Sequence, residues 1–232
     1  YKVTSGYQAT YENNTLKVVF NNLKACTCSN GPVTFSADTE VTVGYKAKLD
    51  SSKIFEGGVM KTDFSGLVGQ PQKNKVTLTY SNNPHNTESY GKTVEHLAYD
   101  YTYGIDVTKV GSDVDKSGNK PALAGVQFIL QESESNDYIK ADGTLTSNKN
   151  DAILTTNSEG KINVVGLDEG TYILTEVKPA PGYNNSAADG ITFTITNDNL
   201  PTNGDSFNPG CNLAEGTEGN LVQATAATDG KV

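Results

Sequence analysis

Four polar residues occupy positions where the alternation of a β-strand would place them on the inner face. They are Lys109, Glu176, Asn197 and Asn82, each two residues after an apolar residue of the same register. In a strand, residues i, i+2 and i+4 share one face, and an unpaired charge on a buried face is costly. These four positions therefore call for a chemical explanation.

A lysine, a glutamate and an asparagine that meet in one small core can react with one another. Burial disfavours both charged forms, so a buried amine tends to lose its proton and a buried carboxyl tends to keep one. A neutral amine is a nucleophile, and a protonated carboxyl can polarise a carboxamide carbonyl. We therefore predict that Lys109 attacks the side-chain carbonyl carbon of Asn197 and expels ammonia, while Glu176 moves the protons. The amide cross-link would form once per molecule, so the chain would modify itself and would not be an enzyme with turnover.

A plainer interpretation competes with this one. Each of these residues ends its strand, where a side chain can turn out to solvent, and strand-end Lys, Glu and Asn usually do so. For any single residue the solvent-facing interpretation is favoured. The coincidence of three complementary groups in one domain puts the two interpretations on equal footing.

Alternating segments separated by turn residues predict an all-β fold. Only 35% of the chain is AVILMFWYC, and Gly, Ser, Thr, Asn and Asp are abundant, which favours strands and turns. The expected strands are 16–20, 41–49, 75–81, 94–110, 123–130, 152–157, 161–167, 170–178 and 190–197. Residues 201–232 have few apolar residues, and a long loop or a poorly ordered end is expected there.

The segment 94–110, VEHLAYDYTYGIDVTKV, predicts a domain boundary. It is long enough for two strands, with a row of Leu and Tyr residues before Gly104 and the row Ile105, Val107 and Lys109 after it. A strand that leaves one domain and becomes the first strand of the next would have this form. We predict two tandem immunoglobulin-like β-sandwich domains, residues 1–103 and 104–232.

Composition excludes several functions. The net charge is −9, and all 18 basic residues are Lys, so a nucleic-acid partner is not expected. No apolar run reaches the roughly 18 residues of a membrane helix, so membrane insertion is not expected either. His85 and His96 stand in no catalytic or metal motif, and we expect no metal and no cofactor. The three cysteines, Cys26, Cys28 and Cys211, fit either one long-range disulfide or three free thiols.

Several motifs resemble a known family. The segments PALAGVQFIL, NSEGKINVVGLDEGTYILTEVKPAPGYN and GITFTIT resemble the CnaB-type (prealbumin-like) domain of Gram-positive surface proteins, and GTYILTEVKPAPGYN resembles its E-box. KVTLTYSNNP followed by YDYTYGIDVTKV is similar to a junction between domains of a sortase-assembled major (backbone) pilin. The resemblance implies an intramolecular isopeptide bond from Lys109 with Glu176 as its catalytic acid, and a second acceptor, Asn82, in a CnaA-like first domain.

The chain departs from that pattern in informative places. The acceptor Asn of such a domain often lies on a final strand in a V-x-N context, and this chain ends at ATDGKV, so the acceptor is either Asn197 or a residue beyond Val232. No inward-facing Lys pairs with Asn82, and its donor is expected upstream of Tyr1. The Y-P-K-N and LPxTG motifs are also missing. We therefore expect the first domain to lack its first strands and the second to lack its last.

The expected function follows from the resemblance. It implies an extracellular shaft subunit of a cell-wall-anchored pilus that is joined covalently by sortase to other pilin subunits and supports adhesion to host extracellular-matrix proteins or glycans. The alternative is a surface adhesin module that is not polymerised and binds a host protein or glycan.

Overall fold

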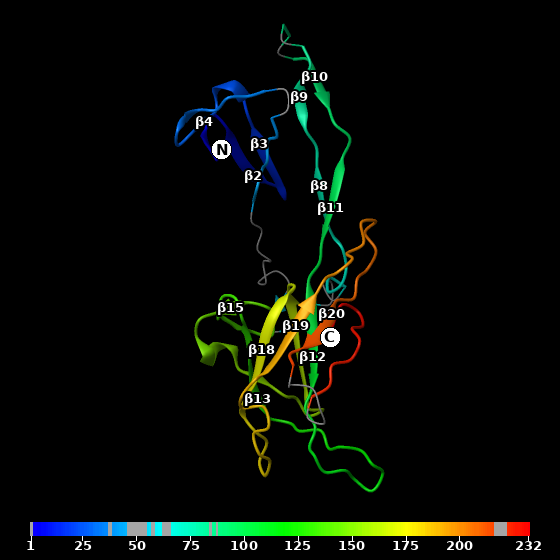
Figure 1. The fold of residues 1–232 in the computed structure, drawn as a ribbon. Coiled ribbons are helices and arrows are strands. Elements are labelled where there is room, and N and C mark those ends of the chain that lie inside the picture. Colours follow the sequence, from blue (N-terminus) through cyan, green and yellow to red (C-terminus); the bar gives the residue numbers. More distant parts are fainter. Residues whose placement is uncertain are drawn as a thin grey trace. The chain divides into compact units, whose positions relative to one another are not determined.

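The computed structural model describes residues 2–36, 39–45, 55–56, 59–61, 66–83, 85–86, 88–215 and 222–232 (Figure 1). The chain divides into two compact units, Tyr1–Lys48 and Leu49–Val232. The all-β prediction is confirmed: in the described ranges the only helices are two short 3-10 turns, η1 (Leu23–Ala25) and η3 (Lys149–Ala152). None of the described helices has the length and apolarity needed to cross a membrane. The boundary predicted between residues 103 and 104 stays a prediction.

The first unit consists of short antiparallel pairs. Strands β2 (Gln8–Glu12) and β3 (Thr15–Val19) form a hairpin, and β1 (Val3–Ser5), β4 (Thr27–Cys28) and β5 (Gly31–Pro32) form a three-stranded sheet. The expected strand 16–20 is therefore present as β3. The expected strand 41–49 is wrong for residues 41–45, which are not part of a strand, and residues 46–49 lie outside the described residues.

The first part of the second unit is a series of two-stranded ribbons. Strand β6 (Phe55–Glu56) pairs with β7 (Val59–Met60), β8 (Gln72–Val76) with β11 (His96–Asp100), and β9 (Thr79–Ser81) with β10 (Tyr90–Lys92). Apolar side chains on β8 to β11 and the residues between them remain exposed, including Val76, Leu78 and Tyr80. This part of the unit contributes little to its buried core.

The rest of the second unit is a β-sandwich. One layer follows the order β15 (Leu145–Thr146), β14 (Tyr138–Ile139), β13 (Gln127–Glu132), β18 (Gly170–Lys178), β19 (Ile191–Thr196) and β20 (Gly210–Leu213), with β16 (Leu154–Thr155) also on β13. The other layer is the antiparallel pair of β12 (Tyr103–Thr108) and β17 (Lys161–Leu167). Buried side chains of both layers form one core, which includes Ile105, Val164, Leu130, Tyr172 and Ile195. Figure 1 shows β13, β18 and β19 side by side, as their pairing requires.

The tail is more ordered than its composition predicts, so the expected loop over residues 201–232 is wrong in two places. Strand β20 pairs antiparallel with β19. Farther along, Gly230–Val232 runs parallel to β12: the Gly104 N–H donates to Gly230 O (3.1 Å), and the Asp106 N–H donates to Val232 O (2.8 Å). Both additions depend on backbone pairing with strands already present, which requires few apolar side chains.

Two glycines permit this last pairing. Gly69 has φ +67°, and a Cβ there would lie 2.5 Å from the Gly230 Cα. The Gly69 N–H donates to Thr102 O (2.8 Å), and Gly69 O accepts from the Phe207 N–H (2.8 Å), so the backbone has little room to move away. Residue 69 must therefore be glycine for close approach as well as for its positive φ.

We predict that Gly69→Ala lowers the free energy of unfolding by about 3 kcal/mol, because a backbone clash adds to the cost of the left-handed conformation. Gly118→Ala is the matched control, since Gly118 has φ +82° but no atom within 4 Å of the added Cβ. The control should cost about 1 kcal/mol, the backbone strain alone. Urea denaturation measures both values, and equal losses in the two variants would contradict the clash.

Candidate functional site

Glu176 lies on the inner face of β18, as the alternation predicts. Tyr172, Leu174 and Glu176 are all buried, and the Glu176 side chain has no exposed surface. The start of this strand is fixed by Tyr172, whose hydroxyl donates to Asp168 O (2.8 Å) and accepts from the Asp168 N–H (3.3 Å). Burial raises the pKa of the Tyr172 hydroxyl. A carboxyl is thus held in the core by a strand whose other inward residues are apolar.

Lys109 reaches this carboxyl from the opposite layer of the sandwich. It follows directly after β12, where its N–H donates to Gly160 O (2.8 Å) and its carbonyl accepts from the Leu123 N–H (3.0 Å). Its Nζ lies 2.9 Å from Glu176 Oε2, and 18% of the side chain is exposed. The pair therefore bridges the two layers, as the sequence analysis requires of these two residues.

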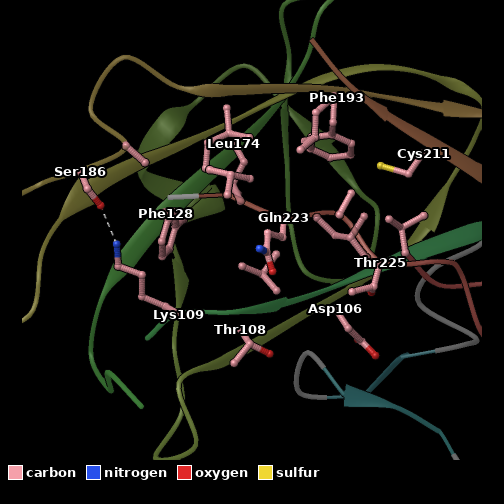
Figure 2. Close-up of a pocket in the computed structure, with 18 residues that line it drawn as sticks. Asp106, Thr108, Lys109, Phe128, Leu174, Ser186, Phe193, Cys211, Gln223 and Thr225 are labelled. Carbon is pink, nitrogen blue, oxygen red and sulfur yellow. Dashed lines mark hydrogen bonds between the residues drawn. The ribbon is translucent and has the colours of Figure 1, made fainter. Parts of the chain in front are cut away.

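The loop after β18 folds back over the pair. The Glu176 N–H donates to Ala187 O (3.0 Å), and Asn185 Nδ2 donates to Glu176 O (2.8 Å). Lys109 Nζ also donates to Ser186 Oγ at 2.9 Å, a contact visible in Figure 2. No alternation in the sequence points to Ser186 or Asn185, and the one signal there is a run of small polar residues directly after the E-box.

One oxygen of the carboxyl has no partner. Glu176 Oε1 is buried and makes no hydrogen bond to any described residue. A buried polar atom without a partner is rare in folded proteins and needs an explanation. Oε1 is available to accept a hydrogen bond or, when protonated, to donate one.

A cavity of about 210 Å³ lies beside Lys109 and Ser186, between the two layers (Figure 2). Its walls are mostly apolar, and Lys109 and Ser186 lie at its polar edge. Further residues around it are Ile105, Val107, Phe128, Leu174, Ile191, Phe193, Cys211, Leu213, Gln223 and Val232. The space could take an additional side chain next to the Lys109 amine.

The three cysteines, all of them among the described residues, form no disulfide. Cys26, Cys28 and Cys211 are free thiols, and burial raises the pKa of Cys211. Within the described ranges, no three His, Cys, Asp or Glu side chains are grouped so that they could hold a metal ion.

The structure does not bring Asn197 to Lys109 and Glu176. In the β18–β19 pairing Gly170 lies opposite Ile195 and Leu174 opposite Ile191, so Asn197 lies beyond the Gly170 end of β18. Glu176 lies toward the other end, six residues or about 20 Å of extended chain from Gly170, so Asn197 is farther still from Glu176. Asn197 shares the predicted face but is at the wrong end of the sheet.

Asn82 is likewise not in a core. Its side chain is exposed, and its Oδ1 accepts from Ser89 Oγ (2.7 Å) across the β9–β10 ribbon. The inward face predicted for it does not exist among the described residues, because β9 has only β10 as a partner. A contact with a donor lysine is not part of this arrangement.

A family model matches the part of the chain that carries Lys109 and Glu176. Residues 105–207 match the model described as SpaA, prealbumin-like fold domain. This segment is a prealbumin-like domain. Lys109, Glu176 and Ser186 all lie within it, and the resemblance of the E-box segment to such a domain is confirmed. No curated protein is similar enough to the chain to count as a match.

Solved structures similar to the chain include streptococcal pilins. The T6 backbone pilin of Streptococcus pyogenes serotype M6 is 26% identical, with 53% of this chain and 24% of that chain covered and a TM-score of 0.36. The major pilin GBS80 of Streptococcus agalactiae, a 35 kDa C-terminal fragment, is 20% identical, with 56% and 47% covered and a TM-score of 0.41. The group B streptococcus pilus 2b backbone protein is 19% identical, with 84% and 62% covered and a TM-score of 0.42. The chain thus spans less than two thirds of each of these solved chains.

We predict that Lys109→Met destabilises the prealbumin-like domain by about 3 kcal/mol, because it leaves the buried Glu176 carboxyl without its partner. The double variant Lys109→Met/Glu176→Leu should recover most of this loss, since an apolar pair of similar size can replace a buried ion pair. Lys116→Met, at an exposed lysine, should change the free energy by less than about 0.5 kcal/mol. Urea denaturation measures all three, and a double variant as unstable as Lys109→Met would argue against an uncompensated carboxyl.

Proposed function

We propose that this chain is a structural segment of the shaft of a covalently polymerised surface pilus, and that its prealbumin-like domain forms an intramolecular isopeptide bond from Lys109. The observation that carries the proposal is the 2.9 Å contact between Lys109 Nζ and a carboxyl with no exposed surface. The resemblance of the sequence to backbone pilins supports the extracellular, cell-wall-anchored setting. Sortase and other pilin subunits would be the partners.

The reaction uses groups that already touch. A proton passes from Nζ to Glu176, and the neutral amine attacks the carbonyl carbon of an acceptor carboxamide. The bond from Nζ to that carbon forms, and the bond from the carbon to the amide nitrogen breaks. That nitrogen takes up one of the two protons lost by Nζ, which Glu176 passes to it, and leaves as ammonia, while the other proton stays on Glu176.

The acceptor should lie on a strand beside β12. Gly230–Val232 already runs parallel to β12, and Val232 lines the cavity together with Lys109. Val232 lies opposite Ile105, so a strand continuing in this register would pass Lys109 about four residues farther on. Of the two acceptors left open by the sequence, Asn197 or a residue beyond Val232, this geometry supports the second.

An amide bond at this position suits a shaft that is under tension. Ladder hydrogen bonds contribute only about 1 kcal/mol each. A covalent link across a long loop also constrains the unfolded chain, by roughly 4 kcal/mol on the entropy estimate used for disulfides. Unlike a disulfide, it cannot be reduced.

The intact mass of the purified protein tests the bond. We expect the mass to fall by one ammonia in a chain that carries the acceptor, and tandem mass spectrometry should find Lys109 in the cross-linked peptide. Lys109→Ala and Glu176→Ala should keep the full calculated mass, because they remove the nucleophile and the proton carrier. Asn197→Ala is the matched control and should still lose ammonia; a full mass in that variant would restore Asn197 as the acceptor.

One observation favours the alternative function, an adhesin module. Val76, Leu78 and Tyr80 form an exposed row, with exposures of 62%, 60% and 48%, that a host protein or glycan could contact. The two functions differ on the native cell surface. We expect antibodies against this chain to detect a ladder of covalent multimers that survives boiling in detergent, whereas one band, together with binding of a purified host ligand, would favour the adhesin.

A further inference from the structure

We infer that Ser186 is a further residue of the bond-forming site, and that its hydroxyl fixes the rotation of the Lys109 amine so that the nitrogen lone pair is free to attack. This inference rests on the proposed reaction of Lys109. It adds how the amine is held in place before the reaction.

The contacts of Nζ carry the argument. In the described parts of the chain Nζ has two partners, Glu176 Oε2 and Ser186 Oγ, each at 2.9 Å, and it donates to both. A lysine ammonium has three N–H groups, which occupy staggered positions about the last side-chain bond. Two of these positions are taken by fixed oxygens, and the third has no partner.

Proton transfer turns the third position into the reactive one. The neutral amine keeps two N–H groups and gains a lone pair. If the transferred proton resides on Glu176 Oε1, the oxygen without a partner, then Oε2 and Ser186 Oγ accept the two N–H groups. The lone pair then takes the third position, and the Oε1 proton is free to bind the acceptor carbonyl.

Without the Ser186 hydroxyl, the neutral Lys109 amine no longer prefers the orientation that puts its lone pair in the third position. The amine could rotate about its last bond and direct the lone pair into the position that Ser186 Oγ otherwise holds, and so away from the open third position. Ser186 opposes that rotation because its Oγ would lose the N–H that it accepts, while the unprotonated Oε2 keeps the other N–H. The hydroxyl gains and loses no proton in the reaction, so the overall balance stays one amide formed and one ammonia released.

The loop holds Ser186 in register with Glu176. Asn185 binds the Glu176 carbonyl and Ala187 accepts from the Glu176 N–H, so the residues on both sides of Ser186 are tied to the backbone of the carboxyl residue. The Ser186 hydroxyl and the Glu176 carboxyl are therefore held at fixed positions relative to each other, and both contact Nζ. A surface serine on an untethered loop would lack this fixed relation.

The first test measures the reactivity of the Lys109 amine in the unbonded 232-residue chain. N-hydroxysuccinimide acetate labels free amines, and peptide mass mapping reports Lys109 against the exposed Lys116. We expect Ser186→Ala to lower the relative labelling rate of Lys109 about tenfold, the effect of one hydrogen bond to a reacting group. Ser186→Thr keeps the hydroxyl and should restore the rate, while Ser147→Ala, at an exposed serine next to the edge strand β15, should leave it unchanged.

A structural role predicts a different result. If Ser186 acts only through the Lys109 amine, it has no effect once that amine is removed. Adding Ser186→Ala to the Lys109→Ala variant should therefore leave the melting temperature unchanged. An unchanged labelling rate in Ser186→Ala, or an equal loss of stability with and without Lys109, would overturn the inference.

The second test separates this inference from the proposed function. In a chain that carries the acceptor, a time course of intact mass after cell-free synthesis gives the rate of ammonia loss, which Ser186→Ala should slow about tenfold. Equal rates in Ser186→Ala and the parent would overturn the role of Ser186 and leave the bond intact. No ammonia loss in any variant, with reduced labelling of Lys109 in Ser186→Ala, would overturn the bond and leave the positioning of the amine supported.

Discussion

The arrangement of the second unit depends on a carboxyl that is buried with no exposed surface. Glu176 can lie in the core because Lys109 approaches from the opposite layer, and their contact joins the end of β12 to β18. Stability alone does not explain the choice, because a well-packed apolar pair would serve as well or better than a buried ion pair. The unpartnered Oε1 makes the position still less favourable. A reactive role gives both features a reason, since low polarity and a free oxygen are what a proton carrier beside an amine needs.

Alternation along a strand predicted the inner face of β18 correctly, and it agrees with the burial of Ile105 in β12. Tyr172, Leu174 and Glu176 differ by two positions, and all three are buried. The alternation of residues between the two faces, however, does not say where along the strand a residue lies relative to its neighbours on the next strand. Asn197 has the right parity on β19, yet the register with β18 puts it at the far end of the sheet. Register depends on which residues of two strands pair, and one strand read alone does not contain that choice.

Other features were missed because backbone pairing, and not side-chain pattern, determines them. The apolar residues of β20 are only Cys211 and Leu213. The segment Gly230–Val232 is held beside β12 by three backbone hydrogen bonds. Residues 41–45 show the reverse case, because their alternation is good but they form no strand. Ser186 lies in an irregular loop, where no period assigns a face. Its contact with Lys109 follows from two hydrogen bonds that tie the loop to the Glu176 backbone.

The place of the proposed bond agrees with the mechanics of this pairing. β12 has an antiparallel neighbour, β17, on one edge and the parallel segment Gly230–Val232 on the other. Suppose that the chain is pulled at a point before Tyr103 and at a point after Val232. β12 and the parallel segment Gly230–Val232 then slide past each other, and the force acts on all the hydrogen bonds between them at once. Three bonds of about 1 kcal/mol each are a weak clamp. Lys109 lies farther along β12 in the direction that the parallel segment follows, so an amide formed there would carry the load before those hydrogen bonds separate.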